Sequence, residues 1–214
     1  WLATQNEHVA WQGTVYWDLI QPAFMFMVGV AMPFAFAART ARGDSWRSQA
    51  LHAVRRAAML VVIGVLLDHI GSDHVQIGFI RVLQQIAFGY LVAFLLLGRT
   101  LATQGAVVAA ILVGYKALWM FNPWNGPGGP WAQGNANIGS AFDFWLLGRQ
   151  YSGYYVGMNA IPSSATIILG VMAGQYVQGA RDTGRTARTL LLAGVASIVI
   201  GLVAGLWFPI IKRI

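Results

Sequence analysis

The sequence predicts an all-α fold: a polytopic transmembrane helix bundle of about six spanning helices, with one long ordered loop on the outer side. Two observations predict this fold class. Hydrophobic residues make up 57% of the 214-residue chain and charged residues only 10%, whereas soluble domains carry about 25% charged residues to solvate their surface. The apolar residues also occur in continuous runs, each near the length that crosses a bilayer. A soluble globule, a disordered chain, a coiled coil and a collagen-like protein are thereby excluded.

Six apolar runs are the candidate spanning helices. The second run is short, so the sequence defines its boundary least well. Residues 57–67 and 91–97 do not alternate between apolar and polar side chains, which argues against the strands of a membrane β-barrel. The six runs cover about residues 17–38, 57–70, 79–97, 105–120, 161–177 and 190–208.

The longest connection covers about residues 121–160. Loops beyond about 12–15 residues are usually functional or disordered, and this one combines turn residues with many Trp, Tyr and Phe side chains. We therefore expect the loop to be ordered and to pack over the outer face of the bundle. Within it, Ile138–Leu147 has the pattern of a short amphipathic helix near the membrane surface.

The basic residues predict the orientation of the bundle, because Lys and Arg concentrate in cytoplasmic loops. Nine of the fourteen basic residues fall at one end, which we predict to be cytoplasmic, so that both termini lie on the opposite side. Most tryptophans fall on that opposite side, as in an outer aromatic belt. Topology thus accounts for the net charge of +7, and no nucleic acid is expected as a partner. The nine residues are Arg39, Arg42, Arg47, Arg55, Arg56, Arg99, Arg181, Arg185 and Arg188, and the outer tryptophans are Trp11, Trp17, Trp119, Trp124, Trp131, Trp145 and Trp207.

The chain is treated as a single transmembrane domain over residues 1–214, and its start at Trp1 indicates an internal piece of a longer protein. It contains no Cys, so it has no disulfide and no thiolate metal ligand. Two GxxxG pairs, Gly170 with Gly174 and Gly201 with Gly205, are typical of close helix packing in lipid. We expect both pairs to pack within the bundle, with a homodimer contact as the alternative.

Polar residues near the outer ends of the spans form three groups at the same side of the membrane. Such residues are costly near lipid unless they are used, so their convergence indicates a site there. The first group lies in residues 7–18, the second in residues 68–74 and the third in the long loop. They contain His8 and Asp18; Asp68, His69, Asp73 and His74; and Asn137, Asp143 and Asn159.

His8 is the candidate general base, because an imidazole exchanges protons near neutral pH, and Asp18 can orient it. The alternative for His8 is a solvated histidine in a loop. The four residues of the second group have the ligand types of a divalent metal site, but they occupy a short polar turn with no third histidine, and we predict that they bind no metal. Arg81 shares a helix face with Gln84 and Gln85, so it faces a partner or a water-filled cavity unless it snorkels to the headgroups.

Four blocks of sequence resemble the heparan-alpha-glucosaminide N-acetyltransferase-like membrane proteins. The first block combines EHVAWQG at residues 7–13, DLIQP at residues 18–22 and FMFMVGVAM at residues 24–32. It is similar to the family signature of a histidine, a tryptophan and a glycine followed by Asp-Leu, a proline and an aromatic-rich helix. The other blocks follow in the family's order: VLQQIA at residues 82–87 with Tyr90, NIG with Asp143 and LLG within residues 137–148, and LGVMAG at residues 169–174.

The resemblance implies a polytopic acyltransferase that takes acetyl-CoA from the cytoplasmic side and acetylates an amino sugar or related acceptor on the other side. It places the active-site histidine at His8, as a base or a transient acyl carrier, with Asp18 or Asp143 orienting it or binding the acceptor amine. It also implies a protein of the bacterial inner membrane with further helices on both sides of this segment. The substrate-binding positions that follow are Trp11, Arg81, Gln84, Asn137 and Asp143.

Two other function classes remain open at this point. A transporter or flippase for a sugar or lipid-linked sugar would use the same polar cluster as a binding site, and a requirement for acyl-CoA separates the enzyme from it. A scaffold or assembly subunit is disfavoured by the one-sided polar cluster. Acyl transfer to an amine needs no metal, so the expected partners are acyl-CoA, a sugar-like acceptor and the lipid bilayer.

Overall fold

The computed structural model describes residues 5–70, 78, 80–123, 125–126, 129–134 and 136–211, and these residues form helices joined by turns, with no β-strand among them. Five helices are long and apolar enough to cross a membrane, which confirms the predicted all-α transmembrane bundle. A sixth helix of the bundle, Val82–Leu95, is shorter, at 14 residues. The elements are α2 (Tyr16–Ala41), α3 (Trp46–His69), α4 (Val82–Leu95), α5 (Leu101–Met120), α6 (Ile138–Leu147), η1 (Ser152–Tyr154), η2 (Gly157–Asn159), α7 (Ala160–Gln178) and α8 (Thr183–Gly205).

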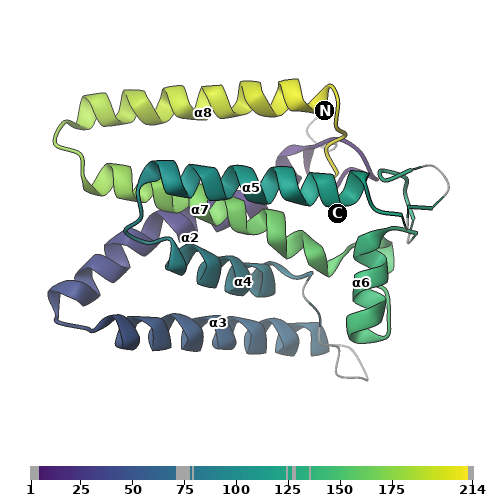
Figure 1. The fold of residues 1–214 in the computed structure, drawn as a ribbon, viewed down its shortest axis with the longest axis horizontal. Coiled ribbons are helices and arrows are strands. Elements are labelled where there is room, and N and C mark those ends of the chain that lie inside the picture. Colours follow the sequence, from purple (N-terminus) through teal and green to yellow (C-terminus); the bar gives the residue numbers. More distant parts are fainter. Residues whose placement is uncertain are drawn as a thin grey trace.

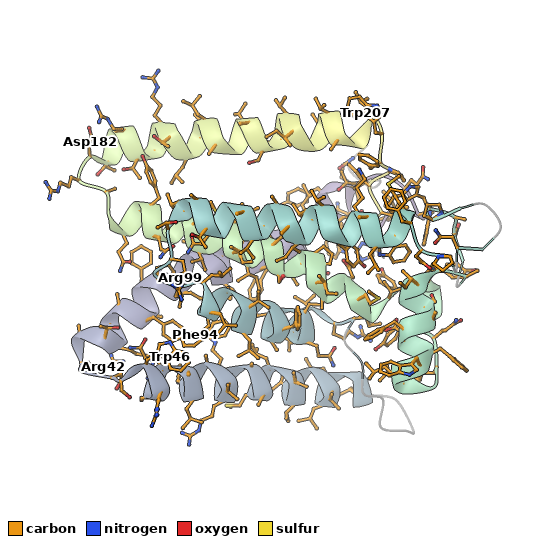
Figure 2. The ribbon with its side chains drawn as sticks, viewed as in Figure 1. Arg42, Trp46, Phe94, Arg99, Asp182 and Trp207 are labelled. Carbon is orange, nitrogen blue, oxygen red and sulfur yellow. The ribbon has the colours of Figure 1, made fainter. Side chains whose placement is uncertain are left out.

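Six of these helices form the bundle and run alternately in opposite directions (Figure 1): α2, α3, α4, α5, α7 and α8. The turns that join α2 to α3, α4 to α5 and α7 to α8 gather at one end, called here the arginine-rich end, which comprises residues 42–45, 96–100 and 179–182. The opposite end, called here the loop end, holds α6 and the segments before α2 and after α8 (Figure 1). Figure 2 shows Arg42, Arg99 and Asp182 at the arginine-rich end and Trp207 at the loop end, in agreement with the predicted separation.

Three helices begin earlier than the apolar runs predict, because polar caps rather than hydropathy set their starts. The side chain of Ser45 accepts a hydrogen bond from the Ser48 N–H, so α3 begins at Trp46 instead of residue 57. Asp182 caps α8 in the same way through the Arg185 N–H, at 3.1 Å, instead of a start at residue 190. Thr100 caps α5, whose predicted start was residue 105.

The early start of α3 corrects the predicted location of three basic residues. Arg47, Arg55 and Arg56 lie on the first turns of α3, not in the loop before it. Long apolar stems let arginines keep a solvated head while the helix backbone continues into the bundle, and Arg56 places its guanidinium over the Tyr90 ring, 5.2 Å from the centroid. α4 differs in the other direction, since it covers Val82–Leu95 only and is shorter than the predicted run over residues 79–97.

The core of the bundle lies where α2 crosses α7 and where α4 packs beside both. Glycines permit this close approach: a Cβ atom at Gly29 would overlap the Ile167 carbonyl oxygen, and one at Gly170 would overlap that of Phe26. Gly174 meets the Val30 carbonyl in the same way, so Gly170 and Gly174 pack within the bundle as predicted. The large buried side chains around this crossing include Met25, Met32, Ile86, Tyr90, Ile167, Ile168 and Val171.

The second GxxxG pair does not pack as predicted. A Cβ atom at Gly201 would meet nothing within 4 Å among the described residues, and Gly205 approaches only the side chain of Ile210. The reason is that α8 lies at the edge of the bundle beside α7 (Figure 1), with its apolar side chains exposed. Among the described residues, Gly201 therefore makes no close helix contact.

The long loop packs over the loop end, as predicted, in the part of it that the structure describes. Its helix α6 has the predicted bounds, because Asn137 caps the start and Gly148, at φ 68°, ends it in the left-handed region. Trp131 stacks on Trp119 with ring centroids 6.4 Å apart. Its backbone carbonyl also accepts a 2.9 Å hydrogen bond from the Trp11 indole. Trp124 lies outside the described residues.

Candidate functional site

A cavity of about 400 Å³ lies at the loop end, between the first turns of α2, the start of α4 and the first half of α7. Three of the predicted site residues, His8, Asp18 and Arg81, line it together. Asn159 of the long loop lines it as well, so the cavity joins two of the three polar groups that the sequence places at one end of the bundle. The other residues that the chemistry below uses are Trp17, Gln21, Gln85, Tyr155, Asn159, Ser163 and Thr166.

His8 and Asp18 form a direct pair. The Nδ1 atom of His8 lies 2.7 Å from Oδ1 of Asp18, and the two side chains are 52% and 3% exposed, respectively. Asp18 lies in the first turn of α2, where backbone N–H groups lack helical partners and favour a carboxylate. The N–H groups of Val15 and Val9 lie 3.4 and 3.5 Å from its Oδ2 atom. The pair therefore combines a fixed, buried carboxylate with an accessible imidazole.

This geometry determines which ring nitrogen of His8 carries the proton. A carboxylate oxygen can only accept a hydrogen bond, so Nδ1 of His8 carries the proton and donates it to Asp18. The second ring nitrogen, Nε2, is then left with a lone pair that can take a proton or attack an electrophile. The same division of roles operates wherever a buried aspartate orients a catalytic histidine. Trp17 packs edge-on against the His8 ring, with centroids 6.4 Å apart.

Gln85 forms the polar floor of the cavity and connects three helices. Its Oε1 atom accepts hydrogen bonds from Gln21 Nε2 of α2, at 2.7 Å, and from Ser163 Oγ of α7, at 3.0 Å. Its Nε2 atom donates to the backbone carbonyl of Ile80, at 3.1 Å. Because Gln85 is buried, each of these bonds is strong and the group is expensive to leave unpaired. The network fixes the positions of α2, α4 and α7 around the cavity.

Gln84, which the sequence placed in the site, lies elsewhere. Its Oε1 atom accepts from the Arg81 backbone N–H, at 3.2 Å, and its amide packs against Gly64 of α3. Gln84 lines a separate, mostly apolar cavity of about 540 Å³ between α3, α4, α6 and α7. Spacings of three and four residues both fit the helix face of Arg81, so the sequence pattern cannot choose between Gln84 and Gln85.

Asn137 and Asp143, two of the predicted substrate-binding residues, do not line the His8 cavity. Asn137 caps α6: its Oδ1 atom accepts from Ser140 N–H and its Nδ2 atom donates to the Gly134 carbonyl, each at 2.9 Å. Asp143 is buried, lines the Gln84 cavity and accepts a 2.9 Å bond from Gly157 N–H. Burial raises the pKa of Asp143 to about 6, against the opposing effect of that hydrogen bond. Asp18, not Asp143, orients His8.

Trp11 anchors the N-terminal segment to the long loop and does not line the cavity. Besides its bond to the Trp131 carbonyl, its ring meets that of Tyr154 at 87°, with centroids 6.1 Å apart. Tyr154 adopts φ 62°, a left-handed conformation that is rare for a residue with a side chain. The next residue, Tyr155, lines the cavity. Trp11 thus contacts the residue that directly precedes a cavity-lining tyrosine.

Sequence reasoning missed several polar residues of the cavity. Gln21, Ser163 and Thr166 lie inside predicted spans, where a polar side chain marks a functional position. That signal was present for Gln21 and Ser163 but gave no information about which residues they meet.

The second polar group, which is predicted to bind no metal, lies largely outside the described residues. Asp73 and His74 lie outside the described residues, and so do the side chains of Asp68 and His69. The predicted lack of a metal at this group stays a prediction.

A comparison with protein-family models and with curated protein sequences finds no match to this chain.

Proposed function

We propose that this chain carries the active site of a membrane acyltransferase, which moves an acyl group from acyl-CoA to an amine of a sugar-like acceptor. The observation that carries the proposal is the pairing of the exposed His8 ring with the buried Asp18 carboxylate at the edge of a polar cavity. The resemblance of residues 7–32 to the acyltransferase signature supports the same activity.

His8 serves the reaction in one of two ways. In direct transfer, the acceptor nitrogen attacks the thioester carbon while Nε2 of His8 takes the amine proton; the C–S bond then breaks and the leaving thiolate takes this proton from the imidazolium. In a two-step route, Nε2 attacks the thioester carbon and the C–S bond breaks to release the CoA thiolate. The acceptor amine then attacks the acyl-imidazole, the bond between the acyl carbon and Nε2 breaks, and the thiolate takes the proton that the amine loses. Asp18 stabilises the positive ring in both routes.

The polar wall of the cavity suits a hydroxylated acceptor. The cavity is lined by the amide groups of Gln85 and Asn159 and by the hydroxyl group of Ser163. Arg81 adds a cationic hydrogen-bond donor. Amide and hydroxyl groups can both donate hydrogen bonds to sugar hydroxyls and accept hydrogen bonds from them. Trp17 contributes an apolar surface beside His8. An amino sugar offers both the nucleophilic amine and the hydroxyls that this lining recognises.

The proposal is tested with the purified protein in proteoliposomes, radiolabelled acetyl-CoA and glucosamine. The expected result is N-acetylglucosamine that forms only when both donor and acceptor are present. Accumulation of unmodified glucosamine in the vesicles without acetyl-CoA would support the transporter function in its place. Absence of acetylated product with glucosamine and with a panel of other amino sugars would contradict the proposed activity.

A further inference from the structure

A second polar cavity, of about 530 Å³, lies at the arginine-rich end. It is formed by the turn between α4 and α5, the last turn of α7, and the turn that leads into α8. Arg99 lines it from the turn between α4 and α5, and Arg181 and Arg185 line it from the turn before α8 and the first turn of α8. Figure 2 shows Arg99 and Asp182 at this end of the bundle. The cavity is therefore at the opposite end of the bundle from His8.

The positive charge of this cavity is not neutralised by the residues that the structure describes. Among them, none of the guanidinium groups of Arg99, Arg181 and Arg185 makes an ion pair. The cavity contains one carboxylate, Asp182, whose Oδ1 atom caps α8 by accepting from the Arg185 backbone N–H at 3.1 Å. Three cations thus face one anion that already has a structural role.

A buried amide holds this cavity in shape. Gln104 is fully buried in α5, and its Nε2 atom donates to the Leu96 carbonyl at 2.8 Å and to Gln175 Oε1 at 2.6 Å. Leu96 belongs to the turn that carries Arg99, and Gln175 lies on α7 and lines the cavity. Gln104 therefore fixes the Arg99 turn against α7. On the other side, the Thr186 hydroxyl donates to the Asp182 carbonyl at 2.6 Å and secures the α8 turn.

Membrane topology explains why arginines occur at this end but not why three of them share one cavity. Arg39, at the same end, has a carboxylate partner in Asp44 at 2.9 Å. Arg188, one turn beyond Arg185 on α8, does not line the cavity. A topological signal requires positive charge near the membrane and sets no condition on convergence. Convergence on a shaped, polar space indicates an anionic ligand.

We propose that this cavity binds a phosphate ester through Arg99, Arg181 and Arg185. A guanidinium group matches phosphate oxygens with two parallel N–H donors, and its charge persists at any physiological pH. The start of α8 at the cavity edge adds the partial positive charge of a helix N-terminus. The phosphate ester is either the headgroup of an anionic phospholipid or part of a soluble phosphorylated ligand. This proposal stands independently of acyl transfer.

Two probes separate the two sources of phosphate ester. Native mass spectrometry of the detergent-solubilised protein titrated with phosphatidylglycerol or phosphatidylcholine measures headgroup binding. Calorimetry with ADP, against adenosine as the unphosphorylated control, measures soluble phosphate binding. The test variant is Arg99→Gln with Arg181→Gln, and Arg188→Gln is the matched control that removes an arginine outside the cavity. Arg185→Gln provides a second variant if the double variant has a lowered melting temperature.

The expected result is binding of phosphatidylglycerol or of ADP, with affinity at least about tenfold lower for each cavity arginine removed. Arg188→Gln should bind as the wild type does. Selective binding of phosphatidylglycerol identifies a lipid headgroup as the source, and selective binding of ADP identifies a soluble ligand. The proposal is overturned if neither probe binds more tightly than its neutral counterpart, or if Arg188→Gln weakens binding as much as the cavity variants.

Discussion

At the scale of single residues, His8 meets one requirement of the proposed acyl transfer and Asp18 meets another. The reacting nitrogen must reach the substrate, and the His8 side chain is 52% exposed; its orientation must be fixed, and the Asp18 side chain is 3% exposed. The first turn of α2 supplies this fixed point, because its free N–H groups hold a carboxylate in place. In the proposed mechanism Asp18 is a positioning residue, since it acts through His8.

Replacement of Asp18 by Asn tests this positioning role. The amide keeps the size of the side chain and an oxygen for the Val15 N–H, but it loses the charge that stabilises the imidazolium. We expect kcat for acyl transfer to fall by at least about tenfold, with little change in KM. Steady-state kinetics with acetyl-CoA and glucosamine make the measurement. A matching rise in KM with unchanged kcat would assign Asp18 to substrate binding.

Asp143 predicts a pH dependence of stability. Its ordinary pKa of 3.8 is raised to about 6 by burial, so the folded state holds a proton between these values that the unfolded state has lost. Raising the pH from about 4 to about 6 therefore destabilises the fold, by at most about 3 kcal/mol in total, and the cost persists above pH 6.

The variant Asp143→Asn removes this titration while its oxygen still accepts from Gly157 N–H. We expect its melting temperature in detergent to exceed that of the wild type at pH 7.5 and to match it near pH 4. Differential scanning fluorimetry across this range gives the comparison. A difference that is the same at both pH values would show that the carboxyl does not titrate in the expected window.

At the scale of helices, the crossing of α2 with α7 brings the two sides of the His8 cavity together. α2 carries Asp18 and Gln21 in its first turns, and α7 carries Ser163 and Thr166 in its first half. Because the helices touch at Gly29, the backbones approach closely enough for Gln21 and Ser163 to share the Gln85 amide. The site therefore depends on packing that lies deeper in the bundle.

Gly29→Ala should separate α2 from α7. The added methyl group would overlap the Ile167 carbonyl oxygen, and a backbone atom can yield only if the helices move apart. Such overpacking costs about 1–3 kcal/mol, so we expect a lower melting temperature together with reduced acyl transfer. Gly194→Ala in α8 is the control, since its Cβ would meet nothing within 4 Å. Equal stability of the two variants would contradict the close contact.

Hydropathy predicted the existence and order of the helices, and local capping residues decided their ends. The prediction for α6 was accurate because Asn137 and Gly148 are strong start and stop signals in the sequence. α3 began earlier than predicted because its first turns carry arginines, which a search for apolar residues passes over. The exposed position of α8 was beyond prediction, since an apolar helix reads alike in contact with lipid or with protein.

The sequence also predicted part of the candidate site. His8 and Asp18 were found because their chemistry is rare in an apolar chain, and Arg81 because an arginine near a span needs water or a partner. Asp143 and Gln84 have the same polar character but face another cavity. Only the rotation of α4 and the folding of the long loop decide which cavity a side chain lines.

At the scale of the whole molecule, α7 connects two polar cavities at opposite ends of the bundle. Thr166 lines the His8 cavity and Gln175 lines the arginine cavity. Nine residues of helix separate them, which corresponds to about 14 Å along the axis. The buried apolar residues Ile167, Ile168 and Val171 fill the interval. The proposed chemistry at the loop end and the proposed anion binding at the arginine-rich end therefore occupy distinct places in one bundle.

Single cysteines test which end faces the cytoplasm, and the chain has no native cysteine to interfere. Ser48 and Thr183 are exposed at the arginine-rich end, and Gln150 is exposed at the loop end. If arginines mark the cytoplasmic side, Ser48→Cys and Thr183→Cys should resist an impermeant thiol reagent in intact cells, while Gln150→Cys should react. After cell lysis all three should label. The opposite pattern in intact cells would reverse the orientation.

The central claim is that the Nε2 atom of His8 takes part in acyl transfer, and His8→Asn tests it most directly. Asparagine has no ring nitrogen to act as base or acyl carrier, and its amide can still donate to Asp18 in place of Nδ1. Because the His8 side chain is half-exposed, the variant should keep the melting temperature of the wild type.

The measurement is the rate of acetyl transfer from radiolabelled acetyl-CoA to glucosamine by the folded variant in proteoliposomes. The account predicts a rate at least about a hundredfold below that of the wild type, the lower range for loss of a general base. A folded His8→Asn protein that transfers acetyl groups at nearly the wild-type rate would contradict the account.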